Sequence, residues 1–136
     1  MNTRPTRALL DSHQKRLYFF QNLLLVATAD GYLDEKEGDF LVDVGQQLGL
    51  SALDVQPILD NLPLLSFVIP ETGLERTFEL QTLVVMMMED GQVDDREYAL
   101  CLDYATRIGY GRPFLDDLIA KLAPATSAVA SPSPPQ

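Results

Sequence analysis

Apolar residues recur along most of the chain at spacings of three and four, the period of one helical face. The pattern predicts an all-α fold of six to seven helices. The first helix is expected over about residues 6–29 and the second from Asp34 to about residue 48. A shorter third helix is expected at 51–62, with Ser51 as N-cap and Asp54 at N3. The inward face of the first helix is formed by Leu9, Leu10, Leu17, Phe20, Leu24 and Ala27.

The same pattern returns 60 residues later without a gap. Residues 29–37 align with 89–97, and the apolar positions on either side stay apolar. Over residues 23–50, seven of 28 positions are identical. The alignment predicts two three-helix repeats, at about 6–62 and 74–123, related by a pseudo-two-fold axis. In the second repeat, Pro113 suits the first turn of a helix at about 112–122.

The stretch between the repeats, residues 63–73, begins with an apolar run bracketed by Pro63 and Pro70. The run is too short for a helix, so an extended connector packed on the core is expected. The alternative is a docking patch for a partner protein at 64–69. Residues 124–136 form a low-complexity tail rich in Pro, Ser and Ala, which is typical of disorder. The sequence thus predicts one helical domain over 1–123.

Charge narrows the classes of partner. The 136-residue chain carries 20 acidic and 10 basic side chains, a formal net charge of −10. Such a field repels phosphate backbones and anionic membranes, so neither nucleic acid nor membrane insertion is expected. The most apolar stretch, 17–29, is too short to span a bilayer as a helix. The single cysteine, Cys101, lies in an apolar run, and a cytoplasmic location is predicted.

Two acidic turns are the most distinctive local feature, and they have a structural explanation. Gly31 can adopt the left-handed conformation that ends one helix. Asp34 can cap the next helix, with Glu37 as the acidic partner of a capping box. Asp30 is not covered by this account, because an acid at a helix C-terminus is electrostatically unfavourable. The same residue types recur at Asp90, Gly91, Asp94 and Glu97.

A calcium-binding EF-hand loop is a second interpretation of each turn. The spacing Asp-Gly-x-Leu-x-x-x-Glu at 30–37 matches loop positions 5, 6, 8 and 12. However, positions 1 and 3 would be Val26 and Thr28 in the first copy and Met86 and Met88 in the second. These side chains offer at most one oxygen ligand, so a true EF-hand is excluded.

A weaker oxygen-ligated site remains, and carboxylates without His or Cys favour calcium, magnesium or manganese over zinc or copper. Crowded acidic side chains also gain stability from a counter-ion. The alternative is that the acids are solvated helix caps, partly neutralised by Lys36 and Arg96. The candidate metal ligands are Asp30, Asp34, Glu37, Asp90, Asp94 and Glu97.

With these motifs, the chain resembles the tellurite-resistance TerB-like family. The likeness rests on Ala-Asp-Gly-Tyr-Leu-Asp-Glu-Lys-Glu at 29–37 and Glu-Asp-Gly-Gln-Val-Asp-Asp-Arg-Glu at 89–97, and it spans about residues 12–122. The resemblance implies an all-helical bacterial domain of two three-helix halves, proposed to bind metal ions and to act as a sensing or scaffolding module in stress response. Family members include a domain that precedes a J-domain in a membrane-anchored co-chaperone, although this chain has no His-Pro-Asp signature.

Catalysis is not expected. The only histidine, His13, lies in a polar stretch, and no serine stands in a nucleophile context. The run Met86-Met87-Met88 is typical of core packing, because in a helix the three side chains point in different directions.

Two hypotheses for the function follow from the sequence. One is a metal-responsive TerB-like module, and the other is a metal-independent adaptor that binds a protein through its acidic face or the 64–69 connector.

Overall fold

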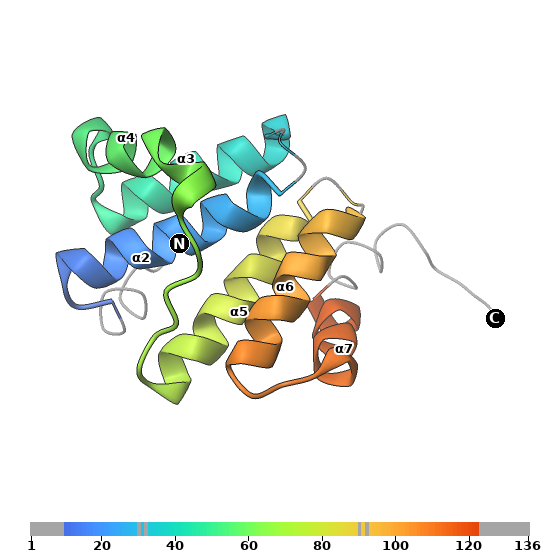
Figure 1. The fold of residues 1–136 in the computed structure, drawn as a ribbon. Helices are drawn as coiled ribbons and strands as arrows, with labels where there is room; N and C mark the ends of the chain where they lie inside the picture. Colours follow the sequence, from blue (N-terminus) through green and yellow to red (C-terminus); the bar gives the residue numbers. More distant parts are fainter. Residues whose placement is uncertain (1–9, 30, 32, 90, 92, 123–136) are drawn as a thin grey trace.

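The computed structural model describes residues 10–29, 31, 33–89, 91 and 93–122. All regular structure in this part of the chain is helical, which confirms the predicted all-α fold (Figure 1). A short 3-10 turn, η1, covers Leu62–Leu64. The α-helices are α2 (His13–Ala27), α3 (Glu35–Leu48), α4 (Ala52–Asp60), α5 (Gly73–Met87), α6 (Asp95–Arg107) and α7 (Arg112–Leu122).

Helix α2 begins at His13, so the expected start near residue 6 was wrong. The side chain of Ser12 accepts a hydrogen bond from the backbone of Lys15 and caps the helix. Just before the cap, Arg16 Nε donates to the carbonyl oxygen of Leu10 at 2.8 Å. This bond holds Leu10 against the core outside the helix, where only 1% of it is exposed. Leu9, also assigned to the inward face, lies outside the described residues.

Helices α2 and α5 pack against each other at the centre of the fold (Figure 1). Helices α3 and α4 contact α2 on one side, and α6 and α7 contact α5 on the other. Phe19 of α2 stacks on Phe78 of α5 with ring centroids 5.5 Å apart. Because α2 is surrounded, its second half is buried on nearly all sides, including Phe19, Leu23 and Val26. The sequence predicted one buried face for this helix, whereas the structure buries residues around most of its circumference.

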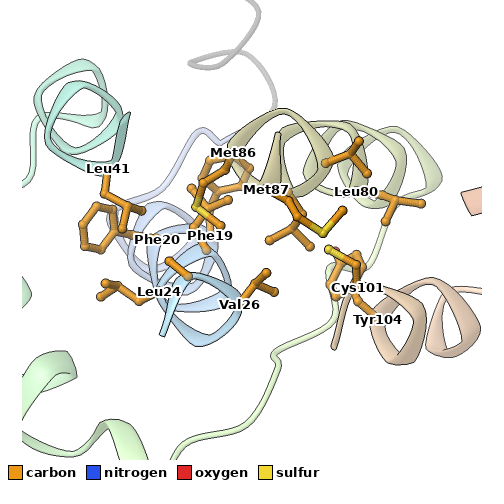
Figure 2. Packing of buried hydrophobic residues seen from close by; sticks show 14 of the residues in the cluster. Phe19, Phe20, Leu24, Val26, Leu41, Leu80, Met86, Met87, Cys101 and Tyr104 are labelled. Carbon is orange, nitrogen blue, oxygen red and sulfur yellow. The ribbon is translucent and has the colours of Figure 1, made fainter. Parts of the chain in front are cut away.

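The core between the layers is apolar and rich in sulfur. Met86, Met87 and Cys101 have no exposed surface, as expected of core residues. In the view of Figure 2, Met87 and Cys101 lie near Tyr104, while Phe20 and Leu41 lie on the other side of the cluster. These side chains join α2, α3, α5 and α6 into one core.

Pro63 and Leu64, where the extended connector was expected to begin, belong to η1, so the predicted start was two residues too early. From Leu65 the connector runs extended across α2 to α5. Asn22 donates to the carbonyl of Val68 at 2.9 Å and accepts from its N–H at 3.0 Å. Phe67 packs edge-to-face on Tyr104, with centroids 5.3 Å apart. Of the expected docking patch, Leu64 is largely exposed, whereas Phe67 and Ile69 are packed against the core.

The local structure repeats with the 60-residue offset. Helix α2 covers 13–27 and α5 covers 73–87. Ser12 and Thr72 cap these helices in the same way. Arg16 and Arg76 each donate to the carbonyl oxygen six residues earlier, at 2.8 and 2.7 Å. These matches concern local geometry, and the pseudo-two-fold axis stays a prediction.

Candidate functional site: the paired acidic turns

The two acidic turns share their backbone geometry. Gly31 and Gly91 have positive φ angles of 81° and 83°. The N–H of Gly31 donates to the carbonyl of Thr28 at 2.9 Å, and that of Gly91 to Met88 at 3.0 Å. A left-handed residue favours glycine, because a Cβ atom is sterically disfavoured there. The left-handed conformation predicted for both glycines is confirmed, but the helices end three residues earlier, at the C-caps Thr28 and Met88.

Asp34 and Asp94 are N-caps. One carboxylate oxygen of Asp34 accepts from the N–H groups of Lys36 and Glu37, at 3.0 and 3.3 Å. One oxygen of Asp94 accepts from the N–H groups of the equivalent residues 96 and 97, at 2.9 and 3.2 Å. These bonds satisfy donors that the first helical turn leaves open. The structural explanation is thus confirmed for both aspartates, each of which keeps its second oxygen out of these cap bonds.

Glu37 and Glu97 lie one turn into α3 and α6 and point inward. Only 2% of Glu37 and 5% of Glu97 is exposed. Both approach the thiol of Cys101: burial raises its pKa, and the charges of Glu97 and then Glu37 raise it further. Two glutamates from opposite halves of the chain therefore lie within electrostatic range of one core residue. Cys101 itself is a buried thiol, which makes it a poor metal ligand.

The turns lie at the same edge of the fold, where Figure 1 shows the α2–α3 and α5–α6 links close to each other. Electrostatics agree with this view. Burial raises the pKa of Glu89 at the end of α5, while Lys36 on α3 lowers it and Asp43 on α3 raises it. Charges from one turn thus act on the other across the α3–α5 contact. The sequence left open whether the turns meet; in the described residues, Lys36 beside the first turn lies within electrostatic range of Glu89 beside the second.

The candidate ligands divide into three groups. Asp34 and Asp94 are surface caps, and Glu37 and Glu97 are buried. Asp30 and Asp90 lie outside the described residues. Among the residues that the structure describes, no group of three or more acidic, His or Cys side chains is arranged to hold a metal ion.

The structure also agrees with the exclusion of an EF-hand. Val26, at loop position 1, is inside α2 and fully buried. The hydroxyl of Thr28, at position 3, donates to the carbonyl of Leu24 at 2.8 Å. In the second turn, Met86 is fully buried within α5. Val26 and Met86 are thus helical core, and the Thr28 hydroxyl is engaged by its own helix, whereas an ion-binding loop would need available oxygens at these positions.

A second polar feature was missed from the sequence. Glu75 and Glu79 on α5 are each only 3% exposed. They line a cavity of about 280 Å³ between the N-terminal half of α2, the connector and α5. The 60-residue register contained a signal, since it aligns Glu79 with core Phe19 and pairs Glu75 with Lys15. An acid at a position equivalent to a core phenylalanine predicts a buried carboxylate.

A third feature is an apolar groove of about 450 Å³ between α3 and α4. Gly38 lines it, where the second half has Tyr98. Tyr98 connects α6 to α7, because its hydroxyl donates to Asp116 at 2.5 Å and accepts from Arg112 at 3.0 Å. Helix α7 packs on both α5 and α6, whereas α4 packs mainly on α2. In the 60-residue register, a glycine that lines a groove in the first half thus corresponds to a tyrosine that bonds α7 in the second half.

Comparisons of the chain with models of protein families, with curated proteins and with solved structures found no match. The resemblance to the TerB-like family accordingly stays a prediction from the sequence motifs. None of the helices in the described ranges has both the length and the apolar character needed to cross a bilayer.

Proposed function

We propose that the chain is a non-catalytic, TerB-like cytoplasmic module of stress response, including tellurite resistance, which binds a divalent cation at its paired acidic turns. The observation that carries the proposal is the juxtaposition of the turns. Glu37 and Glu97, from different halves, both act on the Cys101 thiol, and Lys36 acts on Glu89 across the same edge. In this proposal, the acidic side chains of both bends share one cation at this edge of the fold.

Electrostatics explain why a cation would stabilise this edge. Like charges at short range raise the free energy of the folded state, and a divalent ion reverses that effect. Oxygen-only ligands suit calcium, magnesium or manganese. The ligands in this proposal are Asp30 and Glu37 with Asp90 and Glu97, supported by the oxygens of Asp34 and Asp94 that make no cap bond.

The polar residues that might suggest catalysis have structural contacts. His13 Nε2 lies 3.2 Å from Asp54 Oδ1, which connects the start of α2 to α4. Ser51 and Asp54 form the predicted capping box of α4. These contacts support the non-catalytic part of the proposal.

The test is the melting temperature of chelator-stripped protein with and without calcium, magnesium or manganese. Ligand at a hundredfold excess over its dissociation constant stabilises the fold by about 2.7 kcal/mol. We expect a rise for the natural chain and none for Asp30→Asn/Asp90→Asn. The control Asp60→Asn/Asp117→Asn removes two exposed charges on α4 and α7 and should keep the rise. An equal rise in both double variants would place the cation elsewhere.

The groove between α3 and α4 supports a second candidate, a metal-independent adaptor. Val42 and Leu59 line the groove and are 58% and 44% exposed. In the 60-residue register, the residue equivalent to Gly38 is Tyr98, so we propose an aromatic side chain of a partner helix as the occupant of this groove. The core-packed Phe67 makes the connector a poorer surface for docking than this groove.

Capture of a partner distinguishes the two candidates. Binding that persists in chelator and is lost in Val42→Asp would support the adaptor. The matched control is Val85→Asp, a similar exposed valine on α5 outside this groove. Binding that requires a divalent cation and survives Val42→Asp would instead favour the acidic turns.

A further inference from the structure

The cavity beside α5 is chemically unlike the acidic turns. Leu10, Tyr18, Val68 and Ile69 form apolar walls, and Glu75 and Glu79 lie side by side on one face of α5. Four residues separate the two glutamates, which places them one helical turn apart. Both are buried, so the cavity combines an apolar wall with two carboxylates that are shielded from bulk water.

The two carboxylates differ in how they are neutralised. Glu75 accepts a hydrogen bond from the Thr72 hydroxyl at 2.9 Å, and its other oxygen lies 3.5 Å from the Lys15 ammonium. Lys15 Nζ, which also lines the cavity, lies 3.2 Å from Asp11 Oδ1. An ammonium group thus already sits on one carboxylate of the pair.

Glu79 has neutral partners only. Its Oε1 atom accepts from Asn22 Nδ2 at 2.8 Å and from the Tyr104 hydroxyl at 3.0 Å. Within the described part of the chain, no side chain or N–H donates a hydrogen bond to Oε2. This oxygen keeps some solvent-accessible surface. The unused acceptor therefore belongs to a nearly buried carboxylate that lines a cavity.

We propose that this cavity binds a small aliphatic ammonium ion, with the ammonium group on Glu79 Oε2 and the alkyl chain against Leu10, Tyr18 and Ile69. A carboxylate in an apolar environment gains more from an opposite charge than an exposed one does. The volume of about 280 Å³ is at the lower end of ligand sites and fits a ligand of a few carbons. Lys15 on Glu75 is the internal precedent for this geometry.

A proton competes with such a ligand. Burial raises the pKa of Glu79 to about 7, Glu75 raises it as well, and the bonds from Asn22 and Tyr104 lower it. The other charged groups nearby are Lys15 on Glu75, Glu71, which also lines the cavity, and Arg76, whose charge acts on Tyr104. The ionised fraction of Glu79 therefore grows about tenfold between pH 6 and pH 8. Ammonium affinity should rise by the same factor.

Titration of the full chain with n-butylammonium chloride, followed by NMR shifts of α5 and connector amides, tests the proposal. We expect saturable shifts around the cavity at pH 8, about tenfold weaker binding at pH 6, and none with 1-butanol at equal concentration. Glu79→Gln keeps an acceptor for Asn22 and Tyr104, and it should lose binding at least tenfold. Glu35→Gln, an exposed residue on α3, removes the same charge and should bind normally.

The proposal would be overturned by unsaturable or absent shifts in the natural chain at pH 8, by equal binding of 1-butanol, or by equal affinity at pH 6 and 8. The pH comparison uses the natural chain and so holds even if Glu79→Gln folds poorly. The result is also independent of divalent cations, because the cavity is formed by α2, α5 and the connector and not by the acidic turns.

Discussion

Asn22 Nδ2 on α2 donates a 2.8 Å hydrogen bond to Glu79 Oε1 on α5, inside the interface of the two central helices. The same amide group bonds both backbone groups of Val68 in the connector. All the hydrogen-bonding atoms of one side chain are thus used to join three elements. A primary amide can do so because it has two donor hydrogens and an acceptor oxygen.

Replacement of Asn22 should destabilise the fold strongly. Asn22→Ala removes three hydrogen bonds, leaves the Val68 N–H without its acceptor and opens space beside Glu79. Each lost bond that leaves a buried partner unsatisfied costs about 1–3 kcal/mol, so we expect a loss of about 3 kcal/mol in the free energy of unfolding, measured in urea. The comparison variant is Asn61→Ala, whose exposed side chain bonds only Pro57 and should cost under about 1 kcal/mol. Similar losses would contradict the role assigned to Asn22.

Glu79 should make stability depend on pH. Its pKa is about 7 in the folded chain, above the ordinary 4.5, so the folded state binds the proton more tightly. The stabilisation is fully present below pH 4.5 and is lost as pH rises through 7. Relative to Glu79→Gln, the natural chain should lose about 3 kcal/mol between pH 4 and pH 8. A constant difference between the two unfolding curves would contradict this.

The caps of α3 and α6 can be separated from metal binding. Asp34→Ala removes the acceptor for two N–H groups and should cost about 1 kcal/mol, whereas Asp34→Asn is an equally good cap and should cost little. The same pair of changes at Asp94 should behave alike, because its bonds have the same geometry. Thermal unfolding in chelator measures the cap alone. Equal losses for Ala and Asn would show that charge and not capping matters.

The groove predicts a difference between two helical glycines of α3. A Cβ at Gly38 would lie 3.7 Å from Leu33, an ordinary contact, so Gly38→Ala should stabilise the chain by about 1 kcal/mol. A Cβ at Gly45 would meet Phe20 at 3.4 Å, at the limit of tight packing, so Gly45→Ala should gain less or lose stability. Chemical denaturation of both variants checks the order. A larger gain at Gly45 would contradict it.

Local features were predictable because they depend on few residues. The N-caps Asp34 and Asp94, the left-handed Gly31 and Gly91, and the Ser51–Asp54 capping box depend on backbone groups within about one turn. The extended connector followed from its two prolines and short apolar run. In these cases the side chain, its partner and the backbone conformation lie within a few residues, so sequence spacing fixes the geometry.

Tertiary features were not predictable in the same way. The burial of Glu79 depends on Asn22 and Tyr104, which are 57 and 25 residues away and belong to other helices. The start of α2 was predicted too early because the apolar Leu9 and Leu10 continue the helical spacing in the sequence. In the structure, Ser12 is the N-cap, so the helix begins only at His13. For the candidate metal site, periodicity aligned the two turns but contained no information on their distance in space.

The most direct measurement is a calorimetric titration of chelator-stripped protein with calcium, magnesium and manganese. If the paired turns act as one site, at least one of these ions should bind with a stoichiometry of one per chain, and Asp90→Asn alone should weaken binding even though Asp30 is intact. Two independent ions per chain would contradict a shared site. The absence of binding heat for all three ions at several temperatures, with unchanged melting temperature, would contradict the proposed cation-binding function.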